Sequence, residues 1–264
     1  EMASGTRIVV VGGGIAGLAA AALAARAGAQ VSLLERMSEP GGRARTRNDR
    51  GFLFNMGPHA LYRGGAAMAT LRELGIDPRG GTAPTSGALA LRDGRMHALP
   101  GGLVSLLTTG LLRLPAKLEL ARLLASLPRL DAATLDGVTL ATYLQRSLRH
   151  AGTREVVAAI VRLTGYANAP EELSAGAAIA QLQLGLGPGV RYLDGGWQSL
   201  VDALAHSARD AGVELRSGAR VERVEHDGNV RALRLADGER IACDAVILAL
   251  GPAGTGKTYL AIAK

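Results

Sequence analysis

Cysteine, lysine and aromatic residues are all scarce in this chain of 264 residues. The single cysteine, Cys243, excludes a disulfide framework within the chain, which favours a reducing compartment and gives the cytoplasm as the expected location. Aromatic residues make up only 3% of the chain, too few for a surface that stacks single-stranded nucleic acid. No apolar run reaches the about 18 residues that cross a bilayer, so we expect no transmembrane helix, and the polar start predicts no secretory signal.

Lysine occurs only at Lys117, Lys257 and Lys264, so the formal net charge of +7 comes almost entirely from arginine. The arginines are spread along the chain, which indicates a general arginine bias and no nucleic-acid partner, although an anionic dinucleotide could use part of the charge. Hydrophobic residues make up 48% of the chain and charged residues 20%, which predicts a folded core in one large domain or two smaller ones. The oligomeric state does not follow from the sequence.

Strand and helix alternate at the start of the chain. Arg7–Val11 is β-branched and apolar and predicts a buried strand, and a glycine-rich turn, Gly12–Gly17, follows it. The alanine-rich segment Leu18–Ala27 predicts a helix that closes at glycine, and Gln30–Glu35 predicts a second strand. This order is a βαβ unit with parallel strands.

The glycine-rich turn has the G-x-G-x-x-G spacing of a dinucleotide-binding fingerprint, and it lies between a strand and a helix, with an acidic residue ending the next strand. Gly12 permits the tight turn, Gly14 lets the backbone approach a pyrophosphate, and Gly17 lets the helix pack on the strand. A carboxylate at Glu35 would accept hydrogen bonds from ribose hydroxyls and repel a 2′-phosphate, which argues against NADP. The alternative is a structural turn beside a surface glutamate. The predicted binding residues here are Gly12, Gly14, Ile15, Ala16, Gly17 and Glu35.

The residues after the second strand select FAD over NAD. Arg36 to Thr46 resembles the E-R-x-x-x-x-G-G-R-x-x-T signature of the flavin amine oxidase superfamily, which includes monoamine oxidases, protoporphyrinogen oxidase and carotenoid desaturases. The resemblance implies that Arg36, Gly41, Gly42 and Arg43 lie along the cofactor, with Arg43 near the pyrophosphate or the flavin. Paired glycines allow close approach, and a guanidinium binds phosphate oxygens through a planar fork.

Two further segments extend the resemblance. Gly51–His59 is similar to the family segment G-F-x-F-D-x-G-P-H, which implies that Gly57, Pro58 and His59 approach the flavin ring. Asn55 stands where the family has aspartate, which leaves the role of this position open, and His59 could equally be a structural histidine. Tyr192–Leu200 resembles the family's glycine-pair-then-helix segment. The segment 219–224 resembles its adenine-side strand, which implies that the backbone of Val221 meets the adenine, with an ordinary amphipathic hairpin as the alternative.

The predicted fold class is α/β, a Rossmann-like FAD-binding domain with a parallel sheet and a β-hairpin layer, interrupted by a mainly helical substrate-binding insertion. The FAD-binding domain is expected in two segments, 1–84 and 191–252, with the insertion at 85–190. The leucine-rich insertion contains Gly101–Leu130, expected to be helical with interruptions at its prolines. These helices could line a tunnel for a small apolar substrate, pack as an ordinary core, or, at Gly101–Leu114, contact a membrane peripherally.

The end of the chain carries a second phosphate-binding pattern. Gly251–Thr258 fits G-x-x-x-x-G-K-[ST] and resembles the P-loop of phosphate-starvation-inducible ATPases, in which Lys257 would reach phosphates and Thr258 would hold Mg²⁺. We predict a helix over Tyr259–Lys264. No second strand with a metal-binding aspartate follows, and phosphoryl transfer needs one. We interpret 253–264 as a foreign tail and the chain as a fragment or chimera that lacks the C-terminal half of the family fold.

These patterns predict an FAD-dependent oxidoreductase that removes a hydride from an apolar amine or a polyene-like substrate. The flavin carries the chemistry, and the protein positions the substrate against it. The sequence identifies no catalytic base and no metal site. The alternatives are a non-catalytic dinucleotide-binding fragment and, less favoured, a P-loop ATP-binding protein.

Overall fold

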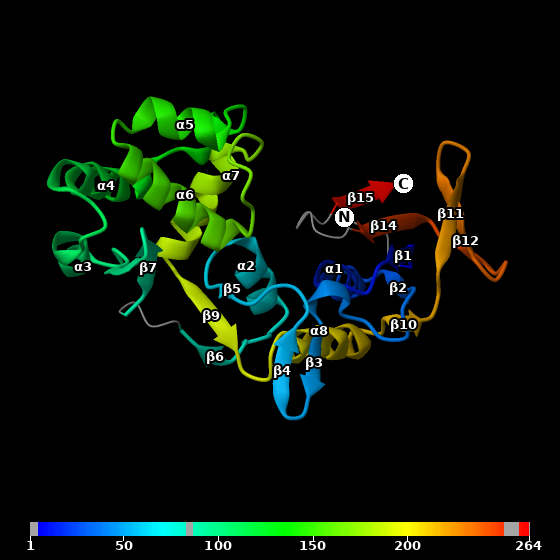
Figure 1. The fold of residues 1–264 in the computed structure, drawn as a ribbon. Helices are drawn as coiled ribbons and strands as arrows, with labels where there is room; N and C mark the ends of the chain where they lie inside the picture. The colour runs from blue at the N-terminus through cyan, green and yellow to red at the C-terminus, as the bar shows by residue number, and fades with distance from the viewer. Residues whose placement is uncertain (1–4, 83–86, 251–258, 264) are drawn as a thin grey trace. The chain divides into compact units, whose positions relative to one another are not determined.

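The computed structural model describes residues 5–82, 87–250 and 259–263, which belong to two compact units (Figure 1). Unit 1 comprises Glu1–Leu61, Ala66–Gly81 and Tyr192–Lys264. Unit 2 comprises Tyr62–Gly65 and Thr82–Arg191. All the residues that the sequence analysis assigned to the cofactor fall in unit 1.

A five-stranded sheet forms the centre of unit 1, in the order β10-β2-β1-β14-β15. The first four strands are parallel, as expected for strands joined through helical crossovers, and β15 runs antiparallel to β14. The predicted parallel sheet is thereby confirmed. The strands are β1 (Arg7–Val11), β2 (Gln30–Glu35), β10 (Glu214–Ser217), β14 (Ala245–Leu250) and β15 (Tyr259–Ala263).

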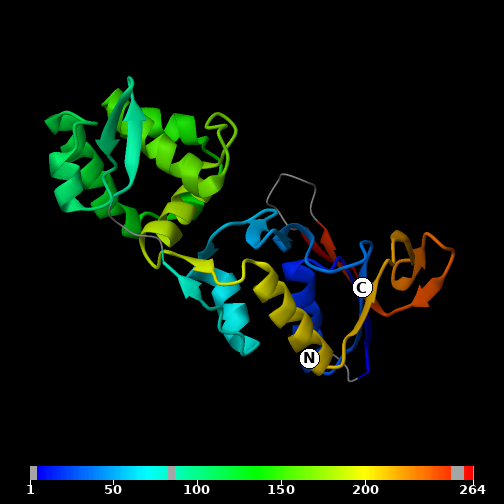
Figure 2. The same ribbon diagram turned by 60° about the horizontal axis from the view of Figure 1, so that its bottom comes forward.

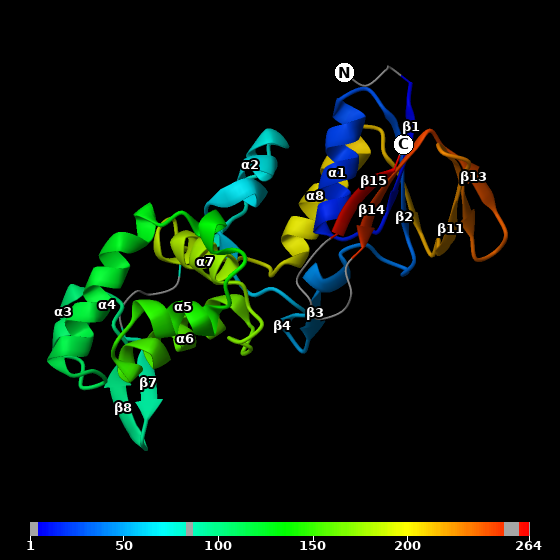
Figure 3. The same cartoon turned by 90° about the horizontal axis from the view of Figure 1, so that it is seen from above.

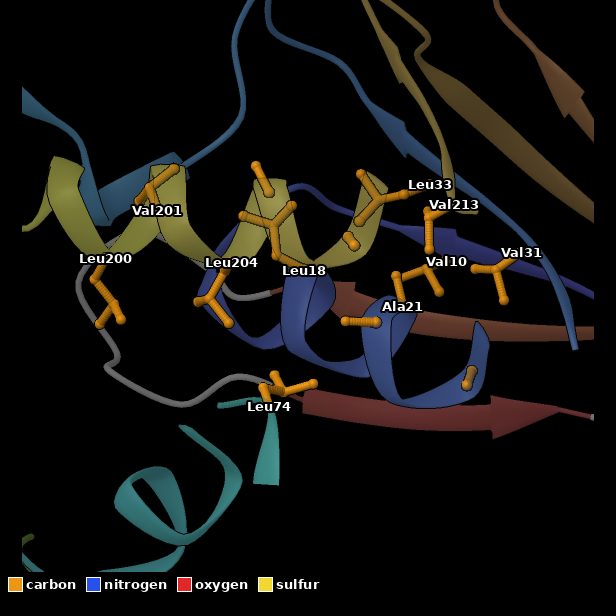
Figure 4. Close-up of a cluster of buried hydrophobic side chains, with 14 of the residues drawn as sticks. Val10, Leu18, Ala21, Val31, Leu33, Leu74, Leu200, Val201, Leu204 and Val213 are labelled. Carbon is orange, nitrogen blue, oxygen red and sulfur yellow. The ribbon is translucent and has the colours of Figure 1, made fainter. Parts of the chain in front are cut away.

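Two helices cover one face of this sheet. Helix α1 (Ile15–Arg26) and helix α8 (Gln198–Asp210) lie side by side, as Figures 2 and 3 both show. Leu18 of α1 and Leu204 of α8 are fully buried and gather with Val10 of β1 in one core cluster (Figure 4). Alanines on α1 allow this close packing, because they fill little space between the two helices and the sheet.

A small antiparallel sheet covers the opposite face. Its strands are β11 (Val221–His226), β12 (Val230–Leu235) and β13 (Arg240–Ala242). Side chains alternate along a strand, so Val9 and Val11 of β1 point away from the helices and pack in a second cluster with Leu233 of β12. Unit 1 therefore has three layers (Figure 3), and the hairpin layer predicted beside the parallel sheet is confirmed.

The remaining elements outside these layers are short. A 3₁₀ turn, η1 (Gly42–Ala44), leads into the hairpin of β3 (Thr46–Asp49) and β4 (Phe52–Asn55). They are followed by β5 (Leu61–Tyr62), α2 (Gly65–Glu73) and β6 (Gly80–Gly81), and later in the chain by β9 (Val190–Leu193).

Unit 2 is mainly helical around its own core. The hairpin of β7 (Leu89–Arg92) and β8 (Arg95–Ala98) turns through Asp93 and Gly94, both at positive φ, as the Asp-Gly pair predicts. Pro115 lies in the first turn of α4, where its missing N–H is not needed, and so separates two helices. The helical elements are α3 (Leu103–Thr108), α4 (Leu114–Ser126), η2 (Leu127–Arg129), η3 (Ala132–Leu135), α5 (Leu140–Ser147), α6 (Ala151–Gly165) and α7 (Ala175–Leu186).

A half-buried carboxylate binds the backbone just before one of these helices. Glu119 of α4 accepts hydrogen bonds from the backbone N–H groups of Arg149 (2.6 Å) and His150 (3.1 Å), which precede α6. Burial by itself would raise the pKa of Glu119, but these hydrogen bonds and the neighbouring His150 ring lower it from its usual 4.5 to about 2. The ionised form of Glu119 therefore stabilises the junction of α4 and α6.

The predicted helix at the end of the chain is wrong. Tyr259–Ala263 forms strand β15, which pairs with β14 along its whole length, from Val246 opposite Ala263 to Leu250 opposite Tyr259. Pairing with an exposed sheet edge outweighs the helical preference of leucine and alanine here. Lys257 and Thr258 lie outside the described residues. Among the helices of the described segments, none is both long enough and apolar enough to cross a membrane.

Candidate functional site

The glycine-rich turn connects β1 to α1 and has little freedom to vary. Gly12 has φ +108°, a conformation that side chains rarely adopt, and its N–H donates to the carbonyl of Leu34 (2.8 Å). A Cβ on Gly17 would lie 1.8 Å from the carbonyl oxygen of Gly12. The first glycine therefore makes the turn and the last one lets α1 pack on it, for the physical reasons that the sequence pattern indicates.

Gly14, the middle glycine, has no such steric or conformational reason to be glycine among the described residues. A Cβ on Gly14 would meet no atom of the residues that the structure describes within 4 Å, and its φ of −73° is open to any residue. Gly14 is also the N-cap of α1, where no side chain accepts a hydrogen bond from the first turn and no acidic residue occurs in that turn. Ile15 and Ala16, both half-buried, begin the helix. The site thus combines bare backbone with an uncapped helix N-terminus, which suits an anion.

Glu35 stabilises the glycine turn through hydrogen bonds to the backbone. The carboxylate is buried, with Oε2 accepting from the N–H of Gly13 (2.7 Å) and Oε1 accepting from the N–H of Met37 (2.9 Å). The alternative of a surface glutamate is therefore wrong. The sequence motif predicts only a hydrogen bond from Glu35 to a ribose hydroxyl. Its structural role could not be predicted, because Gly13 and Glu35 are brought together by the fold. A carboxylate oxygen accepts more than one hydrogen bond, so a role toward ribose stays a prediction.

The paired glycines of the second motif lie against the first. Gly41 has φ +115°, and its N–H donates to the carbonyl of Gly13 (2.7 Å). A Cβ on Gly42 would have Gly14 as its nearest neighbour, with the Gly14 Cα at 3.8 Å. Two glycine segments that are distant in the sequence thus meet with their bare backbones adjacent, next to the N-terminus of α1.

Two arginines, Arg36 and Arg43, belong to the same segment as the paired glycines. Arg36 and Arg43 are both exposed, and within the described ranges the Arg43 guanidinium has no ion-pair partner. Gly57 fits closely against the Arg43 main chain, since a Cβ there would lie 2.6 Å from the carbonyl oxygen of Arg43. Pro58 is half-buried beside it. An exposed guanidinium at this position could bind an anion, although its role toward a cofactor stays a prediction.

His59 is exposed, and its Nδ1 lies 2.9 Å from the carbonyl oxygen of Gly57. This contact is local, two residues back along the chain, and is compatible with either of the roles that the sequence left open. Contact of His59 with substrate or flavin stays a prediction.

Asn55 connects three segments of the site, a role that the sequence analysis left open. Its Oδ1 accepts from the Thr46 hydroxyl (2.7 Å) and from the backbone N–H of Trp197 (3.1 Å). The Thr46 hydroxyl oxygen in turn accepts from the N–H of Gln198 (3.1 Å). Gly196 has φ +74° and leaves no room for a Cβ, which would lie 2.6 Å from the Thr46 hydroxyl oxygen. Both bonds need only an acceptor oxygen, which asparagine shares with the family's aspartate.

Val221 begins β11 close to Glu35. The segment before it is tied to the end of β2, because Gly218 N–H donates to the Met37 carbonyl (2.8 Å) and Ala219 N–H donates to the Glu35 carbonyl (2.9 Å). The register of β11 against β12 shifts directly after Val221. Such an irregularity interrupts the ladder and leaves backbone groups for other partners, although the adenine contact at Val221 stays a prediction.

Comparisons with known proteins agree with this geometry. A family model described as flavin-containing amine oxidoreductase matches residues 15–257. Hydroxyneurosporene desaturase of Cereibacter sphaeroides is 28% identical over 285 residues, covering 94% of this chain and 56% of that protein. Phytoene dehydrogenase of Streptomyces griseus is 30% identical over 285 residues, covering 91% of this chain and 53% of that protein. The chain thus spans about half the length of these curated relatives.

A solved structure shows the likeness of fold. The crystal structure of an oxidoreductase from Methanosarcina mazei matches with a TM-score of 0.73 at 21% identity, over 93% of this chain and 59% of that one. The predicted fold class is thereby confirmed, and the match over 15–257 covers most of both units. This chain belongs to the family of flavin-containing amine oxidoreductases, whose cofactor is FAD.

Proposed function

We propose that this chain binds the ADP half of FAD at the meeting point of its two glycine segments, as part of an oxidoreductase. The observation that carries the proposal is the space over Gly14, where a Cβ would meet no atom of the described residues within 4 Å. No contact among the described residues requires a glycine at that position, whereas a diphosphate lying against the backbone would require one. Gly42, whose Cβ would also be nearly free of contacts, widens the same bare surface.

Each part of the dinucleotide has a group suited to it. The uncapped N-terminus of α1 would donate N–H groups to the diphosphate, helped by the helix dipole. Arg43 would add a positive charge, and a free lone pair of Glu35 would accept from a ribose hydroxyl. The Val221 main chain would face the adenine. When bound, the flavin would supply the two-electron chemistry, and we assign no catalytic residue in this chain.

The substrate that we propose is a small apolar molecule, either an amine or a polyene. The names of two relatives, hydroxyneurosporene desaturase and phytoene dehydrogenase, favour the removal of hydrogen from a C–C bond. The family description favours an amine. Anaerobic addition of candidate substrates to the flavin-loaded protein tests this proposal, because an oxidised substrate leaves the flavin reduced and its visible absorbance bleached. Stable FAD binding without bleaching by any candidate would favour the non-catalytic dinucleotide-binding module instead.

We also propose a peripheral contact with membranes through unit 2. Leu91 of β7 and Met96 of β8 pair directly across the hairpin and are 71% and 62% exposed, so the outer face of this small sheet is apolar. Val104 and Leu107 of α3 add further exposed apolar surface within the segment 101–114. Basic side chains in the same part of the chain, such as Arg95, would favour an anionic lipid surface.

A further inference from the structure

Three arginines lie side by side across the small antiparallel sheet of unit 1. Arg223 of β11 is opposite Arg234 of β12, and Arg234 is in turn opposite Arg240 of β13. Neighbouring strands are about 4.8 Å apart, so this arginine row spans roughly 10 Å. Like charges directly opposite each other destabilise a sheet, so the stability of the fold does not account for the arginine row.

The arginine row faces away from the core of unit 1. Side chains alternate along a strand, and the residues next to the row, Val224, Leu233 and Ile241, pack in the cluster beneath the small sheet. The arginines therefore point to the outer side of the sheet. Their side chains are 67%, 42% and 50% exposed, in chain order, so a partner could reach all three.

One carboxylate lies among the three guanidiniums. Glu225, two residues after Arg223 on β11, accepts from Nε of Arg240 (2.7 Å) and from Nη2 of Arg234 (2.9 Å). Arg223 approaches the same carboxylate only to 3.8 Å, which is longer than a hydrogen bond. The hydrogen bonds from Arg240 and Arg234 hold the pKa of Glu225 below its usual 4.5, so the carboxylate is ionised at neutral pH. Among the described residues, the arginine row thus keeps an excess of positive charge.

Paired acidic residues border the arginine row and limit its length. Asp227 follows β11 and pairs with Arg231 (2.9 Å). Glu239 precedes β13 and pairs with Arg216 (2.7 Å). The backbone of a nucleic acid carries one phosphate after another and would extend past the row onto these carboxylates. A second copy of the chain, docked row to row about a two-fold axis, would place arginine against arginine. The charges therefore favour a short acidic partner.

We propose that the arginine row binds an acidic segment of a partner protein through the carboxylates of that segment. Glu225 shows that these guanidiniums bind a carboxylate by charge-assisted hydrogen bonds. Ala232 and Ala242, which lie beside Glu225 across the sheet, are short, so the arginine ends are the outermost groups here. The proposal goes beyond the proposed function and uses none of the glycine segments.

Fluorescence anisotropy of a short labelled polyglutamate peptide, titrated with the whole chain, tests the proposal. We expect one peptide per chain and weaker binding as salt is added, because salt screens exposed charges. An oligothymidylate of the same formal charge is the comparison. Tighter binding of the oligothymidylate, with the same dependence on the arginine row, would assign the surface to nucleic acid and overturn the proposal.

Matched variants on the same sheet locate the binding. Arg223→Gln should weaken peptide binding about threefold, the size of an exposed ion pair, without lowering Tm, because it removes a like-charge pair with Arg234. Arg231→Gln removes the same charge outside the arginine row, where Arg231 pairs with Asp227, and should leave peptide binding unchanged. Equal weakening by the two variants would show that only net charge matters and would overturn the assignment.

A change of the opposite sign separates binding from structure. Glu225→Gln keeps the shape of the side chain but removes the carboxylate that competes with the peptide, so binding should strengthen about threefold. Unchanged or weaker binding would mean that Glu225 and the arginines only support each other, and would overturn the proposal. Replacing all three arginines by glutamine should weaken binding roughly tenfold or more, and wild-type binding by that variant would also overturn it.

Peptide binding should be unchanged in Gly14→Ala, which alters only the proposed cofactor site. Failure of that site would therefore leave the arginine row intact as a binding surface, and failure of the arginine row would leave FAD binding intact.

Discussion

Replacing Gly14 by alanine should separate cofactor binding from folding. Across the described part of the chain, a Cβ at this position meets no atom within 4 Å, and the φ of −73° suits alanine. Alanine is a poorer N-cap than glycine by up to about 1 kcal/mol, while the loss of glycine's freedom in the unfolded chain returns about 0.4–1 kcal/mol. The net change in the free energy of unfolding should therefore be close to zero, which is a shift in Tm of less than about 2 °C.

The same methyl group should weaken FAD binding strongly. It would stand where the diphosphate approaches the N-terminus of α1, and would lengthen hydrogen bonds that the first turn donates to a charged group. Loss of one such bond costs about 1.5–3 kcal/mol, which corresponds to roughly 10- to 150-fold in Kd.

The assay uses the one tryptophan of the chain. Trp197 is buried in unit 1, so its fluorescence reports both thermal unfolding of that unit and quenching by bound FAD. Gly17→Ala provides the contrast, because its Cβ would lie 1.8 Å from the Gly12 carbonyl oxygen and should cost about 3 kcal/mol or roughly 6–12 °C in Tm. A Gly14→Ala protein with wild-type FAD affinity, or with a Tm as low as that of Gly17→Ala, would refute the reasoning.

Three further predictions concern the supporting contacts. Asn55→Ala removes the acceptor for Thr46 and Trp197 and should lower the free energy of unfolding in urea by about 2–4 kcal/mol. Asn55→Asp keeps an acceptor oxygen and should lower it by less than about 1 kcal/mol. Equal losses of stability in the two variants would contradict the role given to Asn55. Glu119→Ala should cost about 2 kcal/mol at neutral pH. Because folding lowers the pKa of Glu119 to about 2, this stability is present above its usual pKa of 4.5 and is lost as the pH falls toward 2; a difference between Glu119→Ala and wild type that persists at pH 2 would rule the cap out. Leu91→Asp should reduce co-sedimentation with anionic lipid vesicles without changing Tm, whereas Leu163→Asp, at a similarly exposed position of α6, should not; equal effects would argue against the hairpin face.

Local sequence signals were sufficient where one physical requirement dominates. The β1-α1-β2 unit follows from apolar strands, an alanine-rich helix and glycines at Gly12 and Gly17 whose backbone or packing tolerates nothing larger. The strand β3 (Thr46–Asp49) has no such local signal, because its sequence is polar and its pairing with β4 depends on the hairpin turn. β15 was predicted as a helix because a P-loop pattern requires one, and pairing with β14 decides the outcome instead.

The site likewise has features that the sequence predicts and contacts that only the fold determines. Motif spacing identified the glycine segments, but it could not show that Gly41 donates to Gly13 or that Gly13 donates to Glu35, since these contacts depend on the fold. The role of Asn55 does not follow from the motif, because the motif shows the loss of a charge but not the partners of the acceptor oxygen that asparagine keeps.

Competition binding tests the central claim most directly. FAD is titrated into the protein while the fluorescence of Trp197 is followed, and the complex is then challenged separately with ADP and with FMN. Since the proposed site takes the diphosphate and the adenosine, ADP should displace FAD and FMN should not. Displacement by FMN but not by ADP, or no binding of FAD at all, would contradict the account.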